Sequence, residues 1–398
     1  MTVTNTPLTV EDSKSVINAV LDEAFAAKIV KVADREPPAA YSFPYITKEG
    51  EYDYQYYPLS WWTAGFFPGS IWALYERSLK RGFHSLSQDR LLNCAINWSH
   101  KLESHKNTLN THDVGFLIMP SYLREYELTG SKQAGSVIVQ AAESLLTRWS
   151  ETAQVIKSWD KSITGSYEFS NPKSDILVII DNMMNLELLY RASVISQDTK
   201  FAEKATKHAE TTAKYHIRQD FSTYHLVVYD AVTGRRKVGL AHQGYDHEST
   251  WSRGQAWALY GYASVYQYTK EEKYLTLAKK LADYFISRSD DGVVYWDFDA
   301  PRPGPWDTSA AVVAASGLLL ICQLEKNLNY LQPALKLLEV VLDQALAPED
   351  GDVILDRATA ANYRYYKNPT KNHGLVYADY YLIEAGNRLV DLNLIDQL

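Results

Sequence analysis

The sequence has few cysteines and no dense tract of positive charge. Its two cysteines, Cys94 and Cys322, stand far apart with no second Cys or His at metal-ligand spacing. We therefore expect two buried free thiols and neither a disulfide framework nor a zinc site. The net charge is −8, and no cluster of Lys and Arg offers the positive surface that nucleic acid or an anionic membrane requires. With 46% hydrophobic and 22% charged residues, the chain has the composition of a folded globular protein.

The sequence also lacks targeting segments and the motifs of common cofactors. Segment 1–16 has neither a basic region nor an apolar core, and no later apolar run approaches the roughly 18 residues that span a bilayer. We therefore expect a cytoplasmic protein. No glycine-rich nucleotide-binding motif and no serine-hydrolase nucleophile elbow is present. Segment 242–248 is rich in His and acidic residues but contains no H-E-x-x-H pattern, so we expect no metal and no cofactor.

Aromatic residues are abundant, with 10 Trp, 29 Tyr and 11 Phe making up 13% of the chain. Aromatic rings stack on the apolar faces of sugars while their polar ends reach the hydroxyl groups. Tyr and Trp also fill large helical cores, and composition alone favours that second explanation. The aromatic content is therefore compatible with sugar binding but does not establish it.

Helical periodicity dominates the chain and occurs in two kinds of segment. Some segments have apolar residues at helical spacing and one polar side, which predicts amphipathic helices; Thr9 and Asp12 give the first of these a capping-box-like start. Others open with polar, glycine-containing or aromatic residues and continue apolar on most sides, as expected for helices inside a ring of others. The amphipathic segments are 16–29, 138–149, 274–285 and 331–346, and the six buried ones are 61–76, 111–128, 176–192, 250–268, 306–322 and 376–390.

The six buried segments recur about 50 to 70 residues apart, which suits one helical hairpin per repeat. Six hairpins of alternating buried and amphipathic helices predict an all-α fold, an (α/α)6 toroid. The starts of the inner helices then gather at one mouth of the barrel, where we expect the chemistry. Alternation in 223–230 and in 293–299, the latter after an Asp291–Gly292 turn signal, predicts short β-hairpins in the loops. Since no linker divides the chain, we predict one catalytic domain over residues 1–398.

Two aspartates lie in apolar surroundings near the starts of buried segments. Asp113 precedes the apolar run 114–118, and Asp181 follows the apolar run 176–180. A buried carboxyl close to a second one has a raised pKa and can serve as a general acid near neutrality. Either aspartate alone could instead cap its helix by accepting backbone N–H groups. The occurrence of two such carboxyls favours acid/base chemistry.

Segment 241–257 is the densest polar and aromatic stretch of the chain and predicts a ligand-binding loop. Arg253 could bind a substrate carboxylate through its planar guanidinium, and Trp257, one turn later, could stack on a sugar ring. A structural Arg–Asp pair and a core Trp explain these two residues equally well. His225 could donate to a substrate oxygen, although a single His on a strand is more often structural.

A set of short motifs is specific in its order and spacing. These motifs are WTAGFFPGSIW (62–72), HDVGFL (112–117), IIDNMMNLELLYRA (179–192), YH (224–225), HQG (242–244), STWSRGQAWALYGYA (249–263), DGVVYWDF (291–298) and YADYYLIEA (377–385). In these motifs the sequence resembles the unsaturated glucuronyl hydrolases of glycoside hydrolase family 88, and the likeness runs from about Trp61 to Leu389.

The resemblance implies an (α/α)6 barrel that removes a 4,5-unsaturated uronic acid from the non-reducing end of oligosaccharides made by polysaccharide lyases. In the family, the catalytic acid protonates C4 of the enol ether, water adds at C5, and the hemiketal collapses with loss of the glycosidic bond. The match places the acid at Asp181 and the assisting carboxylate at Asp113, the pair that their apolar surroundings also indicate. The residues matched to contacts with the unsaturated sugar are His225, Gln243, Arg253 and Trp257, with Trp62 as an aromatic wall.

One loop departs from the family pattern, and several functions stay open. Segment 367–374 lacks the Ser/Gly-rich pattern that bacterial members have near the leaving sugar, which leaves the preference for that sugar open. Lys367 and Lys371 could meet a sulfate or carboxylate there, although exposed lysines are more often only solvated. The alternatives to an unsaturated glucuronyl hydrolase are an unsaturated rhamnogalacturonyl hydrolase, an inverting glycosidase with carboxyls roughly 6.5–9.5 Å apart, and a carbohydrate-binding protein without turnover. The expected partner is an unsaturated oligosaccharide.

Overall fold

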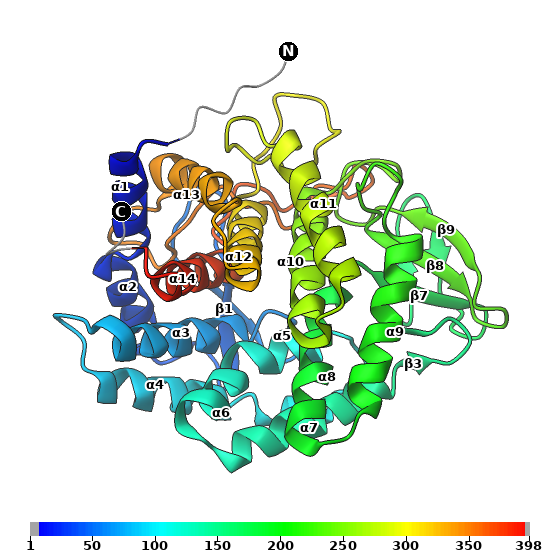
Figure 1. The fold of residues 1–398 in the computed structure, drawn as a ribbon, viewed down its shortest axis with the longest axis horizontal. Helices are drawn as coiled ribbons and strands as arrows, with labels where there is room; N and C mark the ends of the chain where they lie inside the picture. Colours follow the sequence, from blue (N-terminus) through cyan, green and yellow to red (C-terminus); the bar gives the residue numbers. More distant parts are fainter. Residues whose placement is uncertain (1–7, 395–398) are drawn as a thin grey trace.

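The computed structural model describes residues 8–394, whose helices form an inner and an outer ring (Figure 1). Each inner helix contacts its inner neighbours, and α14 closes the ring against α3. The inner ring consists of α3 (Phe66–Arg81), α5 (Val114–Ile118) continued by the π-helical turn η2 (Met119–Leu123) and α6 (Arg124–Thr129), α8 (Asn182–Ser196), α10 (Ser252–Thr269), α12 (Thr308–Glu325) and α14 (Val376–Asp391). The fold is therefore an (α/α)6 toroid, as predicted.

The outer helices cover the inner ring with their apolar faces. In α13, Leu331, Leu335 and Leu338 are buried, and the helix packs on α12, its inner partner. The helices α1 and α2 complete this layer, since α1 contacts α13 and α14 and α2 contacts α3. The outer elements are α1 (Val10–Val20), α2 (Glu23–Ala33), α4 (Gln88–His100), the 3-10 turn η1 (Glu103–Asn107), α7 (Lys132–Leu146), α9 (Lys200–Tyr215), α11 (Glu272–Arg288) and α13 (Leu331–Ala345).

The N-terminal apolar stripe forms two helices, where the sequence predicts one. Helix α1 begins at the predicted capping box, in which the Thr9 side chain and the Asp12 backbone N–H are paired. Helix α1 ends at Val20, with Leu21 as its C-cap. Asp22 is the N-cap of α2, and its carboxyl accepts the Ala24 N–H at 2.9 Å. The apolar stripe continues across this break because both outer helices pack against the inner ring, so periodicity alone does not reveal the break.

Helix α12 is long and apolar enough to cross a membrane, although the sequence led us to expect no such run. The apolar window of this helix is 83% buried inside the toroid. Every residue from Thr308 to Cys322 is buried. The apolar surface of α12 therefore packs against the surrounding helices.

Four small antiparallel sheets occupy loops in the described part of the chain. The strand predicted over 223–230 is confirmed, but the one predicted over 293–299 is wrong, because this segment forms only single bridges to Trp251, Asp290 and Trp306. The pairs are β1 (Ser42–Ile46) with β2 (Gln55–Pro58), β3 (Trp149–Ser150) with β4 (Val155–Ile156), and β5 (Ser162–Ile163) with β6 (Glu168–Phe169), and the three-stranded sheet has the order β7 (Asp175–Ile179), β8 (Leu226–Asp230), β9 (Arg236–Leu240).

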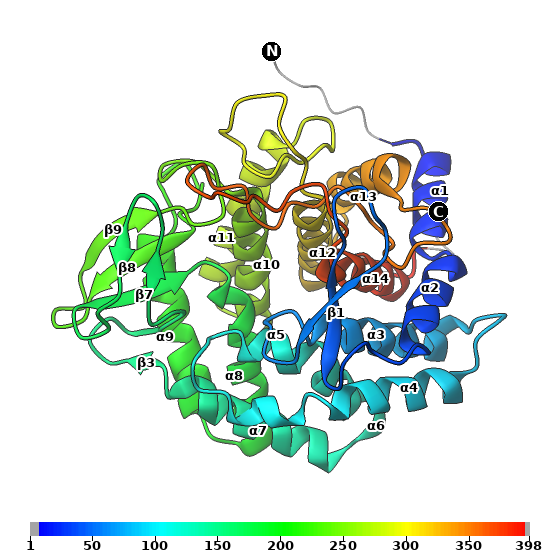
Figure 2. The same ribbon diagram turned by 180° about the vertical axis from the view of Figure 1, so that it is seen from behind.

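The three-stranded sheet brings distant loop residues to the mouth, the end of the ring where the inner helices begin. Strands β7 and β8 pair up to Ile179 and Leu226, and the Ile180 N–H then bonds the His225 carbonyl at 2.9 Å. This register sets Asp181 beside His225. The strand β1 and the orange-red segment before α14 cross the inner helices on the same side (Figure 2).

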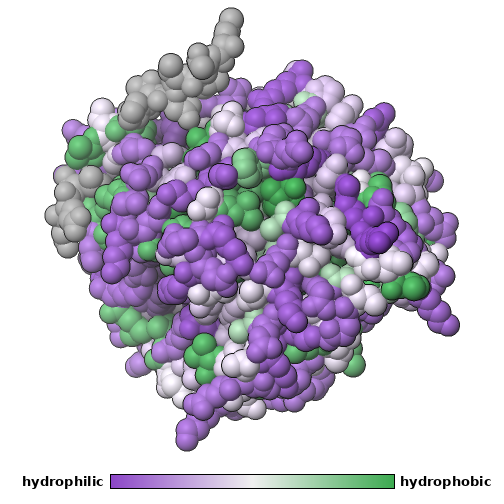
Figure 3. All heavy atoms as spheres, turned by 45° about the vertical axis from the view of Figure 1, so that its right-hand side comes forward, coloured by the Kyte–Doolittle hydropathy of each residue, from purple (hydrophilic) through white to green (hydrophobic). Residues whose placement is uncertain are grey.

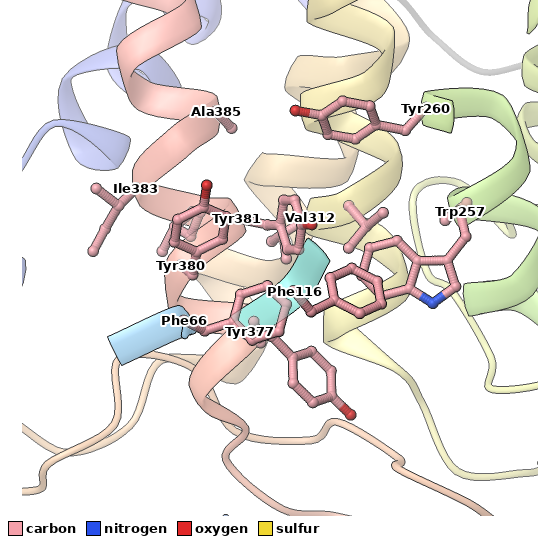
Figure 4. Close-up of a cluster of buried hydrophobic side chains, with 14 of the residues drawn as sticks. Phe66, Phe116, Trp257, Tyr260, Val312, Tyr377, Tyr380, Tyr381, Ile383 and Ala385 are labelled. Atoms are coloured by element: carbon pink, nitrogen blue, oxygen red, sulfur yellow. The ribbon is translucent and has the colours of Figure 1, made fainter. Parts of the chain in front are cut away.

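Aromatic side chains gather inside the ring, while the face of the molecule in Figure 3 is mainly polar. The face in Figure 3 is largely hydrophilic, with hydrophobic side chains in small groups. We call Phe66, Phe116, Trp257, Tyr377 and Tyr381 the aromatic cluster; they meet from α3, α5, α10 and α14 (Figure 4). The ring centroids of Phe116 and Trp257 lie 5.3 Å apart, and those of Trp257 and Tyr381 lie 5.4 Å apart. Part of the aromatic content therefore fills the core.

Candidate active site

A cavity of about 450 Å³ opens at the mouth and contains both aspartates singled out in the sequence. Asp113 and Asp181 are the N-cap residues of α5 and α8, so the two helix starts deliver their carboxyls to one space. Its aromatic walls consist of Tyr45, Tyr57, Trp61, Trp62, Trp159, Tyr366 and Tyr377. Its other lining residues are Ile46, Ile179, His242, Gln243, Ala360, Ala361, Asn368 and Thr370.

Asp181 is buried but does not cap its helix. Its carboxyl accepts no capping hydrogen bond from α8, whereas Asp307, at the start of α12, accepts the N–H groups of Ser309 and Ala310. The capping explanation therefore fits Asp307 and not Asp181. Burial raises the pKa of Asp181 to about 7, with Arg253 opposing and Asp113 adding to the rise. The raised pKa predicted for Asp181 is confirmed.

His225 turns one ring nitrogen toward Asp181. Its Nε2 lies 3.6 Å from the Asp181 Oδ2, slightly beyond a hydrogen bond, and neither atom has another partner within residues 8–394. Its Nδ1 accepts the backbone N–H groups of His242 and Gln243 at 3.1 and 3.3 Å. Burial lowers the pKa of His225 well below its usual value, so the ring is neutral and its proton lies on Nε2. The ring thus offers an N–H donor to Asp181.

Asp113 lies in the cavity wall with its side chain 16% exposed. The Thr111 hydroxyl donates to its Oδ2 at 2.6 Å. The His112 Nε2 lies 3.2 Å from its Oδ1, without the alignment of a full hydrogen bond. Since Asp113 accepts no capping bond from α5, its carboxyl remains directed to these donors and to the cavity.

Gln243 and Trp62 both line the cavity. The Gln243 side chain donates to the Ala360 carbonyl at 2.9 Å, which joins the 241–251 loop to the segment before α14. The Trp62 ring packs between Phe116 and Tyr377, with centroid distances of 5.5 and 5.2 Å. Their positions suit the predicted contacts with a sugar, which stay predictions.

Arg253 and Trp257 lie behind the cavity wall. The Arg253 Nη1 is 2.6 Å from the Asp307 Oδ2, and the guanidinium also donates to the carbonyls of segment 359–360. Trp257 is fully buried and packs on Phe116 (Figure 4). These placements match the structural explanations, an Arg–Asp pair and a core Trp. Direct contact of either residue with a substrate stays a prediction that the observed packing does not favour.

Several residues that line the cavity are not predicted from the sequence. Tyr45 and Tyr57 arrive through the β1–β2 hairpin, for which no strand is predicted. Trp159 and Tyr366 both pack on His242, with ring-centroid distances of 4.7 and 5.6 Å. Of these residues, only His242 lies in a sequence motif that could have indicated it, the HQG motif at 242–244.

The loop before α14 presents its small polar residues to the cavity. Asn368 and Thr370 line the cavity, whereas Lys367 is exposed and Lys371 is half-buried outside it. The two lysines therefore lie apart from the cavity lining.

The described residues offer no evident metal centre. Within 8–394, no group of three or more His, Cys, Asp or Glu side chains is arranged to hold a metal ion. Both cysteines are free thiols, as predicted, and Cys322 is buried. The predicted burial of Cys94 is wrong, because this residue is only half-buried. Burial raises the pKa of each thiol to about 11, which disfavours the reactive thiolate.

Comparisons with known proteins identify the family. The profile of Glycosyl Hydrolase Family 88 matches residues 29–378. An unsaturated glucuronyl hydrolase from Formosa agariphila is 36% identical over 84% of this chain and 81% of its own. The crystal structure of an unsaturated glucuronyl hydrolase specific for heparin has a TM-score of 0.84 and 31% identity, covering 98% of this chain and 99% of that one. An unsaturated glucuronyl hydrolase from Streptococcus agalactiae complexed with dGlcA-GalNAc6S has a TM-score of 0.75 and 25% identity, covering 98% and 94%. The resemblance found in the motifs is confirmed, and the chain belongs to glycoside hydrolase family 88.

Proposed function

We propose that this protein removes a 4,5-unsaturated uronic acid from the non-reducing end of lyase-generated oligosaccharides, with Asp181 as general acid/base and Asp113 as assisting carboxylate. The main support is the Asp181 carboxyl, which is buried, does not cap its helix and lines an aromatic cavity beside a second carboxyl. A pKa of about 7 lets this group hold a proton at neutral pH and still release it. The kinship with unsaturated glucuronyl hydrolases supports the substrate class.

The proposed reaction is hydration of an enol ether. Asp181 donates its proton to C4, the double-bond electrons form the new C–H bond, and the positive charge left at C5 is shared with the ring oxygen. Water adds at C5 and returns a proton to the Asp181 carboxylate. The resulting hemiketal opens to a C5 ketone, and the hemiacetal left at C1 releases the leaving sugar. The product is a ring-opened keto sugar.

The cavity residues, and His225 buried beside Asp181, have distinct proposed roles in this reaction. The Asp113 carboxyl, as assisting group, helps to keep the Asp181 proton in place and stabilises the cation that forms beside it. The neutral His225 ring directs its N–H toward Asp181 and the reacting sugar. Trp62 and the other aromatic walls stack on the apolar faces of the sugar rings. Gln243 supplies hydrogen bonds to hydroxyl groups, which orient the sugar.

The test is a panel of unsaturated disaccharides from glycosaminoglycan, pectin and glucuronan lyases. We expect the ultraviolet absorbance of the conjugated double bond to disappear with at least one of them, with a keto sugar as product. Activity confined to pectin fragments would favour the rhamnogalacturonyl hydrolase alternative. Release of an intact sugar from a saturated substrate would indicate an inverting glycosidase, and binding without turnover would indicate a binding protein.

A further inference from the structure

Asn185 ties the start of α5 to the start of α8. It is fully buried, and its Oδ1 accepts the Phe116 N–H at 2.9 Å while its Nδ2 lies 3.5 Å from the Asp181 carbonyl oxygen. Gly115 allows this close approach, because a Cβ atom there would lie 2.4 Å from the Asn185 Oδ1 and 2.7 Å from its Cα. One side chain thus reaches both helix starts that carry the carboxyls.

Ser158 and His112 form a second tie between the two aspartates. The Ser158 hydroxyl oxygen accepts the Ile179 N–H at 2.9 Å, just before Asp181, and lies 3.3 Å from the His112 Nδ1. Because this oxygen already accepts one hydrogen bond, its own proton is available to Nδ1. Burial lowers the pKa of His112, so the ring is neutral and its proton belongs on Nε2, which lies 3.2 Å from the Asp113 Oδ1.

We propose that Asn185 and the Ser158–His112 pair are positioning residues that hold the Asp113 and Asp181 carboxyls in their working arrangement. All three side chains are 0% exposed, so they act through the aspartates and do not touch the substrate. This inference rests on the proposed function, because it presupposes that the two carboxyls perform the chemistry.

The packing of α5 against α8 matters because burial and the nearby Asp113 charge both contribute to the acidity of Asp181. Burial and the charge of Asp113 both raise the pKa of that group. The influence of the Asp113 charge weakens with distance and with entry of water. Loosening α5 from α8 therefore lowers the pKa of Asp181. The acid then loses its proton at a lower pH, and the basic limb of the pH profile of kcat moves to lower pH.

Paired variants separate the hydrogen bonds from the space that the side chains fill. His112→Gln keeps an N–H near the position of Nε2, whereas His112→Phe keeps the ring shape without it. Ser158→Thr keeps the hydroxyl that Ser158→Ala removes. Asn185→Leu removes both hydrogen bonds of Asn185 at similar volume.

We expect His112→Phe, Ser158→Ala and Asn185→Leu to lower kcat roughly 10- to 100-fold, as small displacements of catalytic groups do. We expect KM to change less than about threefold and the basic limb to move down by at least about 0.5 pH unit, because the aspartates are affected and the sugar contacts are not. His112→Gln and Ser158→Thr should restore most of kcat and of the pH profile. If Asn185→Leu does not fold, the comparison of His112→Phe with His112→Gln tests the proposal.

Asn387→Leu is the matched control. Asn387 is also buried and also joins two inner helices, since its Oδ1 accepts from the Arg77 Nε at 2.9 Å and its Nδ2 donates to the Ala73 carbonyl at 2.8 Å. This variant should melt at a lower temperature but keep the basic limb of the wild-type profile. The inference is wrong if the folded His112→Phe and Ser158→Ala variants also keep that limb. The proposed function itself fails on a different result, namely no turnover of any unsaturated disaccharide by the wild-type protein.

Discussion

The two ends of the inner ring use buried carboxyls in opposite ways. At the mouth, the Asp181 Oδ2 has no hydrogen-bond partner within residues 8–394. At the far end lies a second cavity, of about 280 Å³, whose lining includes Glu76, Arg124 and Glu384. There the Arg124 Nε is 3.1 Å from the Glu76 Oε2, and its Nη2 is 3.3 Å from the Glu384 Oε1. In the mouth cavity no cation of the described residues is in contact with the Asp181 carboxyl, whereas in the far cavity the carboxyls of Glu76 and Glu384 are paired with Arg124.

The aromatic cluster lies between the two cavities. Tyr377, together with the neighbouring Trp62, faces the mouth cavity, whereas Phe116 and Tyr381 line the far cavity. Figure 4 shows these rings converging from different inner elements. The cluster therefore separates the mouth cavity from the ion-paired far cavity within the same ring of helices.

Burial raises the pKa of carboxyls in both cavities, and contact with cations decides whether the pKa ends above or below its ordinary value. Burial alone would raise the pKa of Glu76, but Arg124 and Lys80 together lower it to about 2. Burial raises the pKa of Asp181 to about 7, because Arg253 offsets only part of the effect. The same loss of solvation thus yields a stable anion where cations touch the carboxyl and a proton donor where they do not.

The largest expected effect is on catalysis at the mouth. Asp181→Asn keeps the shape of the side chain but has no proton to donate, so we expect kcat to fall by roughly 10²- to 10⁴-fold. Equilibrium binding of an unsaturated disaccharide, measured by calorimetry, should persist. Turnover at the wild-type rate would remove Asp181 from the proposed mechanism.

The next effect is on stability at the far end. Glu384 accepts hydrogen bonds from Tyr260 and Ser316 as well as from Arg124. Glu384→Gln removes one of the two carboxylates that face Arg124 and the carboxylate that faces Arg388, so we expect the free energy of unfolding to fall by about 3–5 kcal/mol. Activity per folded molecule should stay near the wild-type value.

The pH dependence of this loss has a defined sign. Arg388 and Arg124 lower the pKa of Glu384 against the effect of burial. The stabilisation is therefore present above the ordinary pKa of a glutamate and disappears as the pH falls through the lowered one. Urea denaturation of wild type and Glu384→Gln should converge in acid, and Glu349→Gln, at an exposed position, should show no comparable loss. A constant difference at all pH values would contradict the ion-pair explanation.

The inner ring and the two aspartates are predictable from the sequence because burial on every side leaves a regular apolar signal. In α12, residues 308–322 are all buried, and the sequence predicts this helix within a few residues of its ends. Asp113 and Asp181 stand out against the same background, since an ionisable side chain in an apolar run is costly unless it is used.

Contacts between distant segments are what the sequence does not reveal. The run 176–180 is apolar throughout, and such a run does not distinguish the buried strand β7 from the start of a buried helix. Trp159 and Tyr366 reach the cavity only through loops packed against His242. The orientation of Arg253 likewise depends on Asp307, a partner 54 residues away that no local pattern indicates.

A smaller effect is expected on the pH dependence of stability at Asp181, and it sharpens the contrast between the mouth cavity and the far cavity. The pKa of Asp181 is raised from 3.8 to about 7, so the folded protein holds this proton to higher pH than the unfolded chain does. The contribution of this carboxyl to the stability of the wild-type protein therefore falls as the pH rises from about 4 to about 7, whereas an Asn at this position does not titrate. Relative to wild type, Asp181→Asn should gain roughly 2–4 kcal/mol of unfolding free energy between pH 4 and pH 8.

Denaturation in urea at several pH values measures this gain. The trend has the opposite sign to that of Glu384→Gln, whose deficit appears as the pH rises. A difference between Asp181→Asn and wild type that does not vary with pH would show that the carboxyl titrates normally in the folded protein.

The smallest effect concerns charge outside the mouth cavity. Lys367 and Lys371 do not belong to its lining, whereas Asn368 and Thr370 do. We expect Lys367→Ala and Lys371→Ala to change kcat/KM less than about threefold, equally for sulfated and unsulfated leaving sugars, because exposed charges contribute little. Asn368→Ala, which alters the lining, is the positive control and should have the larger effect on both substrates. A selective loss of about 10-fold or more on the sulfated substrate alone would mean that a lysine reaches the sulfate of the leaving sugar. The mouth would then form an ion pair only when the substrate is bound, whereas the carboxylate–arginine pairs of the far cavity exist without any ligand.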